Sequence, residues 1–310
     1  MKKIELGATL VFLCAAGIAV PAIAQQSSVP GVPVNAVVTL EARRSKEIPR
    51  IEKQDIQVTE AGQKRDVTDF KSLADSRTQL LLMIDDSARG TFNTEIPTLK
   101  KFITSLPSNF EVGVGYMRNG MTQMTANFTT DHSAAANGIR VAMGPGGADV
   151  SPYDSLADAV KKWPKPEAER REVIMISGGI EGLGGGFISD NPYVMAGIQA
   201  AQKAGVVVYA IYSPSVGHFG HDYWQWWWGQ NFLSELTDAT GGEFYTVGYG
   251  SPVSFQPYLQ QILELQSRQY LLTFVAGAEK KAGLQPLRVA ILNKDASIAF
   301  PTKVFVRASL

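Results

Sequence analysis

The sequence predicts an α/β protein in which a doubly wound, mostly parallel sheet is inserted into a small β unit formed by both ends of the chain. Two observations support this. Between residues 77 and 267, short apolar runs alternate with stretches of helical periodicity, as expected for buried strands covered by helices. The flanking segments 25–76 and 268–310 contain only strand-like stretches, so we expect them to pair with each other.

Residues 1–24 have the features of a removable export signal. Two lysines precede an apolar stretch from Leu6 to Val20, and Ala22-Ile23-Ala24 forms a small-x-small cleavage signal. The apolar stretch is short for a membrane span, so we expect cleavage before Gln25 and a secreted or periplasmic protein. The one cysteine, Cys14, lies in the removed segment, which leaves the mature chain without a disulfide or a lipid anchor.

The flanking β segments contain runs of apolar and β-branched residues bounded by turn formers. In the amino-terminal segment we expect strands at 34–39, 56–60 and 65–70. In the carboxy-terminal segment we expect them at 270–275, 286–291 and 303–307.

The middle segment supplies the parallel sheet and its helices. We expect buried strands at 79–85, 112–117, 172–177, 206–212 and 243–247. Residues 121–128 alternate polar and apolar side chains, which predicts an antiparallel edge strand. Helices are expected at 94–106, 133–143, 154–162, 194–204, 231–240 and 254–268. Ligands of such sheets bind outside the carboxyl ends of the strands.

Charge and motif content exclude several classes of function. The 29 basic residues balance the 29 acidic ones and form no basic block, which argues against nucleic acid or an anionic membrane as the partner. After the export signal, no stretch approaches the length of a membrane span. The chain has no Gly-x-Ser-x-Gly motif and no evident acid–base carboxylate pair, so we expect no enzymatic activity.

Several segments carry a family resemblance. The run Leu80 to Ile84 ends in Asp85-Asp86-Ser87-Ala88-Arg89, and further on come Tyr153-Asp154-Ser155-Leu156, Arg171 to Gly179, and Ala204 to Tyr209. In order and spacing, residues 77–267 resemble a von Willebrand factor type A domain. With its flanking β segments, the mature chain is similar to bacterial secreted proteins of the "VWFA-related" kind.

This resemblance implies a metal-ion-dependent adhesion site, in which Mg²⁺ is held by hydroxyl and carboxylate oxygens and keeps a position for a partner's carboxylate. Asp85 and Ser87 match the first loop of that site, and Ser151 lies one residue away from the place of the family's threonine. Arg89 replaces the second serine, and Gly178 replaces the third-loop aspartate. We therefore expect a degenerate site and no cofactor.

Three alternatives remain open at this site. Arg89 could pair with Asp85 as a built-in cation, or Asp85 could cap backbone amides while Arg89 faces solvent. In the third alternative, Asp86, Asp149 and Glu181 rebuild a different site for Mg²⁺ or Ca²⁺.

An aromatic segment lies farther along the chain. Four of the five tryptophans, Trp224, Trp226, Trp227 and Trp228, fall within five positions. On a helix Trp224, Trp227 and Trp228 share a face and Trp226 points elsewhere, whereas on a strand Trp227 is the odd one out. In either case we expect at least one ring outside the core, as a contact surface for a protein or glycan. The alternative is a lid packed on the sheet edge or the β unit.

We therefore predict an exported, non-enzymatic binding module whose partner is a protein or an extracellular polymer. The residues expected to contact the partner are Arg89, His218, His221, Trp224, Trp226, Trp227 and Trp228. Alternatives are a structural subunit of an envelope assembly, a divalent-metal-dependent adhesion protein, and a zinc hydrolase using His218, His221 and Asp222, although backbone-bonded histidines explain that pattern more simply.

Overall fold

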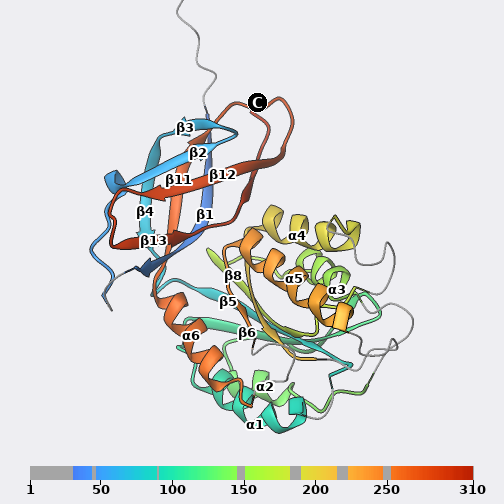
Figure 1. Ribbon diagram of the computed structural model, residues 1–310. Helices are drawn as coiled ribbons and strands as arrows, with labels where there is room; N and C mark the ends of the chain where they lie inside the picture. Colours follow the sequence, from blue (N-terminus) through green and yellow to red (C-terminus); the bar gives the residue numbers. More distant parts are fainter. Residues whose placement is uncertain are drawn as a thin grey trace, which may run out of the picture.

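The computed structural model describes residues 31–43, 47–88, 91–144, 151–181, 190–214, 223–246 and 253–309. Within these ranges the chain forms a six-stranded sheet covered by helices and, beside it, a sandwich of two four-stranded sheets (Figure 1). The N-terminal strands and the last strands of the chain lie together in the sandwich, and the segment between them forms the α/β domain.

The central sheet has the strand order β10-β9-β8-β5-β6-β7. All neighbouring pairs are parallel except β6 and β7, which are antiparallel. The strands are β5 (Thr78–Asp85), β6 (Phe110–Arg118), β7 (Met121–Thr129), β8 (Arg170–Ser177), β9 (Val206–Tyr212) and β10 (Phe244–Tyr245). This arrangement confirms the predicted mostly parallel sheet and its antiparallel edge strand.

Helices cover both faces of this sheet, because side chains of each strand point alternately to the two sides. On one face, Leu80, Leu82 and Ile84 of β5 join a core cluster with α1 (Thr91–Thr104), α2 (His132–Asn137) and α6 (Gln256–Ser267). On the other face, Leu81 and Met83 join a second cluster with α3 (Pro152–Lys161), α4 (Pro192–Ala204) and α5 (Tyr223–Thr240).

The two ends of the chain pair in the sandwich, as predicted. Its sheets have the orders β13-β1-β11-β4 and β14-β12-β2-β3. The strand β1 (Val32–Ala42) pairs antiparallel with β11 (Gln269–Ala276), and β2 (Ile56–Glu60) pairs antiparallel with β12 (Gly283–Ile291). The remaining elements are the 3-10 helix η1 (Lys53–Asp55) and the strands β3 (Gln63–Arg65), β4 (Val67–Ser72), β13 (Ala296–Ala299) and β14 (Lys303–Val306).

A buried polar network lies where α6 passes into β11 and the α/β domain meets the sandwich. Arg170, at the start of β8, donates from Nε to Thr78 Oγ1 (2.6 Å) and from Nη1 to the Gln266 carbonyl oxygen (2.6 Å). Gln266 Nε2 donates to Glu172, and Gln269 Nε2 donates to the Tyr209 hydroxyl (2.9 Å). Side chains of both parts therefore depend on one another for hydrogen bonds.

The structure differs from the predictions at element ends. The predicted strand 65–70 is divided between β3 and β4, the helix expected at 133–143 ends at Asn137, and β13 was not predicted. The helix expected at 231–240 begins earlier, at Tyr223, so it includes all four clustered tryptophans. Residue 247 of the predicted strand 243–247 lies outside the described residues. None of the described helices is long and apolar enough to cross a membrane.

Candidate functional site

Asp85 ends β5 at the carboxyl edge of the central sheet and accepts hydrogen bonds from two neighbouring serines. Ser87 donates to Asp85 Oδ1 from its backbone N–H (2.9 Å) and from Oγ (2.6 Å). Ser177, the last residue of β8, donates from Oγ to Asp85 Oδ2 (3.1 Å). The structure thus brings together the predicted pair Asp85 and Ser87 and adds Ser177.

Asp86 points into a different environment, although it is the next residue. Its carboxylate accepts from Arg140 Nη1 (2.7 Å), from Arg118 Nη1 (3.2 Å) and from the Met143 backbone N–H (2.9 Å). Burial raises the pKa of Asp86, but the hydrogen bonds from Arg140, Met143 and Arg118 outweigh this effect and lower the pKa below its usual range. Asp86 is therefore occupied by two guanidinium groups and is not placed to ligate a cation beside Asp85.

Ser151 acts locally as the N-cap of α3. Its Oγ accepts from the Asp154 backbone N–H (3.1 Å), and its carbonyl oxygen accepts from Ser155 Oγ (3.1 Å). The hydroxyl is fully buried, and its lone pair toward Asp154 satisfies one of the unpaired N–H groups at the start of the helix.

The residues directly after β8 contact both the strand end and α3. The Gly179 N–H donates to Ser177 Oγ (3.0 Å), and the hydroxyl of buried Tyr153 donates to the Gly179 carbonyl oxygen (3.0 Å). Burial raises the pKa of Tyr153 well above its usual value, with further contributions from the charges of Glu181 and Glu235. Tyr153 therefore stays protonated and remains a hydrogen-bond donor to this loop.

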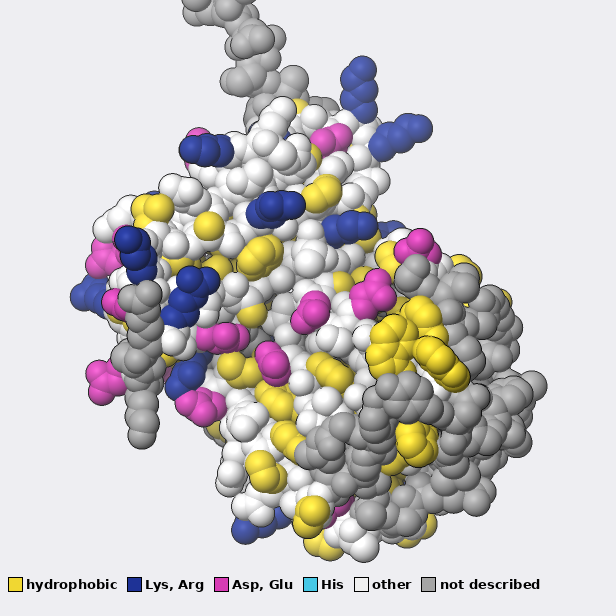
Figure 2. All heavy atoms as spheres, in the orientation of Figure 1, with side chains coloured by type: hydrophobic (Ala, Val, Ile, Leu, Met, Phe, Trp, Pro, Cys, Tyr) yellow, Lys and Arg dark blue, Asp and Glu magenta, His cyan; other side chains and the backbone are white. Residues whose placement is uncertain are grey.

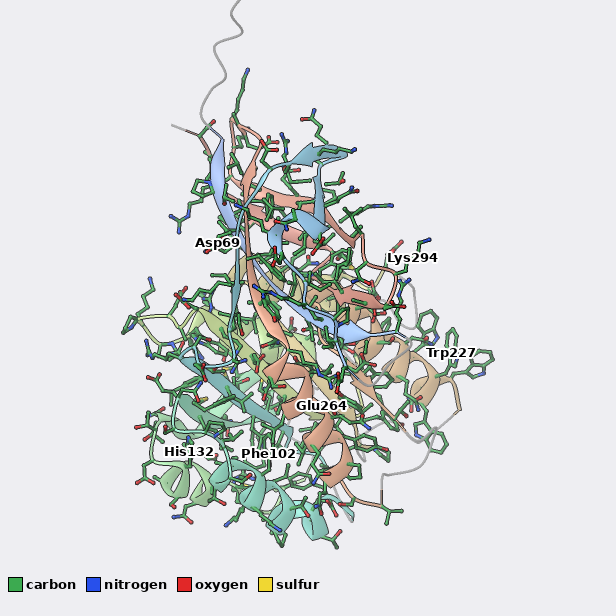
Figure 3. All side chains as sticks on the ribbon, turned by 90° about the vertical axis from the view of Figure 1, so that its left-hand side faces the viewer. Asp69, Phe102, His132, Trp227, Glu264 and Lys294 are labelled. Carbon is green, nitrogen blue, oxygen red and sulfur yellow. The ribbon has the colours of Figure 1, made fainter. Side chains whose placement is uncertain are left out.

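The clustered tryptophans lie on the first turns of α5, so the helical alternative is confirmed. Trp224 and Trp227 are 61% and 41% exposed, and Figure 3 shows Trp227 standing out from the ribbon at the edge of the molecule. Trp226 and Trp228 are half-buried. The Trp228 ring lies 5.4 Å from Phe232 and meets Trp227 edge to face at 4.9 Å, measured between centroids.

A glycine contact attaches the start of α5 to the strand-end edge. A Cβ added to Gly229 would overlap the Gly178 carbonyl oxygen, so only glycine allows the helix to lie this close to the end of β8. The exposed tryptophans and the cluster of Asp85, Ser87 and Ser177 therefore belong to the same edge of the sheet. Figure 2 shows large hydrophobic side chains gathered on the α/β domain on this side.

Neither protein-family models nor curated protein sequences match the chain. Solved structures do. An aerotolerance-related membrane protein from Bacteroides fragilis is 13% identical over 61% of this chain and 98% of its own, with a TM-score of 0.44. The vWF domain of a type V pilus tip protein from Porphyromonas gingivalis is 9% identical over 61% and 95%, with a TM-score of 0.45. The VWA2 protein from Sulfolobus acidocaldarius is 11% identical over 89% and 76%, with a TM-score of 0.41.

The strand order, the antiparallel edge strand and the Asp85-x-Ser87 turn directly after β5 are features of a von Willebrand type A fold. The central domain has a von Willebrand type A fold. Its strand-end edge is where the family's metal site would lie.

The residues at this edge are a poor fit to such a metal site. Mg²⁺ needs near-octahedral oxygen ligation, and Gly178 contributes no side chain where the family has a carboxylate. Ser151 Oγ caps a helix, and Asp86 is bound by two arginines. Among the described residues, no group of three His, Cys, Asp or Glu side chains is arranged to hold a metal ion.

Some predicted site residues lie outside the described part of the chain. These are Arg89, Asp149, His218, His221 and Asp222. The proposed pairing of Arg89 with Asp85 and the zinc alternative therefore stay predictions.

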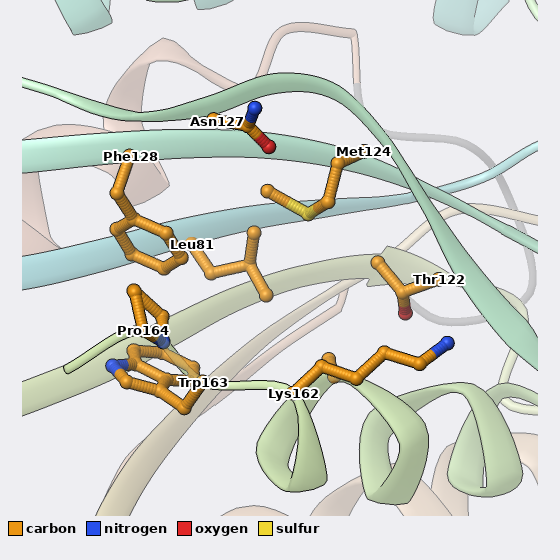
Figure 4. Close-up of a pocket in the computed structure, with 9 residues that line it drawn as sticks. Leu81, Thr122, Met124, Asn127, Phe128, Lys162, Trp163 and Pro164 are labelled. Carbon is orange, nitrogen blue, oxygen red and sulfur yellow. The ribbon is translucent and has the colours of Figure 1, made fainter.

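The fifth tryptophan occupies another part of the von Willebrand type A domain. Trp163 follows α3, donates from Nε1 to Gln79 Oε1 (2.9 Å), and packs at 5.0 Å from Phe128 of the edge strand. Together with Leu81 and Met124 these rings border a hollow of about 210 Å³ between β7 and α3 (Figure 4). This hollow lies on the α3 face of the sheet, and Trp163 packs at its border.

Proposed function

We propose that the protein is an exported, non-enzymatic binding module that captures a protein or an extracellular polymer through the exposed tryptophans of α5. The observation that carries this proposal is the exposure of Trp224 and Trp227, 61% and 41%, on the first turns of a helix that is fixed to the strand-end edge. Export follows from the signal-like residues 1–24.

The surroundings of these rings support a contact surface. The Trp228 ring packs on Phe232 and meets the Trp227 ring edge to face. Gly229 lets the helix lie directly against Gly178. Large aromatic side chains on a rigid base give a broad contact area at low entropic cost, which is typical of residues that dominate binding energy. The exposure of Trp224 and Trp227 favours a contact surface over the lid alternative, in which these rings would be buried.

The same edge supports binding without a metal ion. The Ser87 backbone N–H and the hydroxyl groups of Ser87 and Ser177 donate to the Asp85 carboxylate, so its oxygens have hydrogen-bond donors from the protein itself. The missing carboxylate at Gly178 removes the ligand that would help neutralise a divalent charge.

The aromatic surface is tested by the double substitution Trp224→Ala and Trp227→Ala. Because both rings are exposed, we expect the free energy of unfolding to change by less than about 1 kcal/mol, while capture of the partner from a native envelope extract or extracellular polymer is lost. Leu292→Ala, at an exposed residue of the sandwich, is the matched control and should leave capture intact. Unchanged capture by the double variant would contradict the proposal.

Metal independence is tested on the unmodified protein. Since an ion that binds only the folded state raises stability by RT ln(1 + [L]/Kd), a working site would shift the melting temperature. We expect no shift with millimolar Mg²⁺ or with EDTA, and no heat of binding by calorimetry. The variant Arg89→Ser with Gly178→Asp restores two missing ligand types and should show a Mg²⁺-dependent shift. A shift in the unmodified protein would instead identify a divalent-metal-dependent adhesion protein.

A further inference from the structure

A cleft of about 660 Å³ lies between the β sandwich and the α/β domain. It is bordered by residues 32–37 of β1 on one side and by the starts of β8 and β9 on the other. Because β8 and β9 are parallel, their starts lie at the opposite end of the sheet from Asp85 and the tryptophans. The cleft is therefore separate from the surface proposed above.

One wall of this cleft is an open strand edge. β11 pairs with β1 from Val32 to Thr39, but on the other side β13 pairs only with Thr39 to Ala42. Backbone groups of successive strand residues point to alternate sides. The Leu40 N–H bonds to Arg268 on the β11 side, so the N–H groups of Asn35 and Val37 point to the open side. Neither has a backbone partner there among the described residues.

Pro33 has the same orientation as Asn35 and Val37, and it lacks an N–H group. A proline whose nitrogen faces the open side of an edge strand leaves the other ladder intact. The stretch available for pairing therefore begins after Pro33 and extends to Thr39, where β13 takes over.

The opposite side of the cleft carries positive charge. Lys203 at the end of α4, Lys303 on β14 and Arg307 just after β14 all line it, and none forms an ion pair within the described residues. The Lys203 Nζ lies 5.4 Å from the centre of the Phe305 ring, which keeps the ammonium group over β14.

The other charges that line the cleft are already neutralised. Glu169 pairs with Lys71 (3.4 Å), and Arg171 pairs with Glu167 (2.6 Å). The cleft is left with an excess of three cations facing a strand edge that has free donors, so a ligand with carboxylates and an extended backbone is complementary to it.

We propose that this cleft binds an extended acidic peptide segment of a partner protein, which adds a strand to the open edge of β1. The backbone of the segment pairs with Asn35 and Val37, and its carboxylates face Lys203, Lys303 and Arg307. The edge from Val34 to Thr39 is about 20 Å long, which matches roughly six residues of a strand.

The probe is a labelled peptide of about six residues in which Glu and Val alternate, and a peptide with Lys in place of Glu is its control. We expect saturable binding of the acidic peptide to the full chain, at least tenfold weaker binding of the basic one, and weaker binding at high salt. Lys203→Glu with Arg307→Glu, two exposed substitutions, should weaken acidic-peptide binding at least tenfold.

Strand pairing is tested at Asn35. Asn35→Pro removes the N–H that faces the open side and spares the β1–β11 ladder, whereas Asn35→Ala removes only the side chain, whose Oδ1 accepts from Thr273 Oγ1. We expect at least tenfold weaker binding for Asn35→Pro and less than twofold for Asn35→Ala. Hydrogen exchange gives a readout that does not depend on folding of a variant: the Asn35 and Val37 amides should become protected when the peptide binds.

Two results would overturn the proposal. If the acidic peptide binds without protecting these amides, or binds Asn35→Pro as well as it binds the unmodified protein, the cleft takes an anion and no strand. If the amides are already protected in the free protein in proportion to its concentration, a second copy of the chain occupies the edge.

Discussion

Asp85 and Asp86 are neighbours in the chain but their side chains have different hydrogen-bond partners. Asp85 accepts hydrogen bonds from Ser87 and Ser177, whereas Asp86 is fully buried against the guanidinium groups of Arg118 and Arg140. Arg140 also lies 3.9 Å above the Tyr116 ring, and the Tyr116 hydroxyl donates to the Arg140 carbonyl oxygen. The carboxylate of Asp86 therefore joins β6 to the segment after α2, beside the candidate site.

The substitution Asp86→Asn should show how much this carboxylate contributes. It leaves two partly buried arginines without their counter-charge, so we expect a loss of about 3 kcal/mol in the free energy of unfolding at neutral pH. The folded pKa of Asp86 is lowered, so its contribution is present above the unfolded pKa of about 3.9 and is lost as the pH falls through the folded pKa. Urea unfolding at several pH values should show the two proteins converging in acid.

Asp75→Asn, at an exposed aspartate, is the control for that experiment and should change stability little. A constant difference between Asp86→Asn and the unmodified protein down to strongly acidic pH would contradict the ion-pair argument, because a protonated Asp86 would then still stabilise the fold.

At the scale of elements, the apolar runs were sufficient to predict the strands of the central sheet. Buried parallel strands are continuous apolar segments, and β5, β6, β8 and β9 have this composition. Element ends were harder to predict because they depend on distant contacts. The helix expected at 133–143 stops at Asn137, and the segment after it turns back so that the Met143 N–H reaches Asp86.

The start of α5 shows the same limit. Its sequence, Tyr223-Trp224-Gln225-Trp226-Trp227-Trp228, has an aromatic bias typical of strands as much as of helices. Tertiary contacts favour the helix. Trp228 packs on Phe232, and Gly229 fits against Gly178, about fifty positions earlier in the chain. Gly229, which directly follows the tryptophans, is the signal in the sequence that another backbone segment lies close by.

The candidate site was predicted in part, for reasons of the same kind. Asp85 and Ser87 follow one strand directly, so their proximity can be read from the sequence. Ser177 ends a neighbouring parallel strand, and its contact with Asp85 requires the strand order to be known. Arg118 and Arg140 are 32 and 54 residues away from Asp86, and no local pattern indicates that they meet.

At the scale of the whole molecule, the β sandwich and the α/β domain share a buried interface. Val37 of β1, a strand of the sandwich, belongs to the core cluster of the von Willebrand type A domain. The Arg170 network lies next to it and joins β5 and β8 to the first residues of β11. Since the sandwich is formed from the two ends of the chain, closing it also fixes the ends of the inserted domain, and we expect the whole chain to unfold in one cooperative transition.

Arg170 and Glu172 lie in this interface, and their substitutions should have different effects on stability. Burial raises the pKa of Glu172, and Arg170, Gln269 and Gln266 offset this only in part. A carboxyl group with a raised folded pKa contributes stability that is present below its unfolded pKa and is lost as the pH rises through the folded pKa. At neutral pH the unmodified protein has already lost the stability that the carboxyl group of Glu172 contributes in acid. Glu172→Gln should therefore reduce the free energy of unfolding little at neutral pH.

Arg170→Met should be costly, because it leaves Thr78, Gln266 and Gln269 without their buried donor and leaves Glu172 without its cation. We expect a loss of about 3 to 5 kcal/mol, measured by calorimetry together with denaturant unfolding. The double variant Arg170→Met with Glu172→Gln should be more stable than Arg170→Met alone, since the charge left unpaired by the first substitution is removed by the second. Strictly additive effects would show that the hydrogen bonds of Arg170, and not its charge, hold the two parts together.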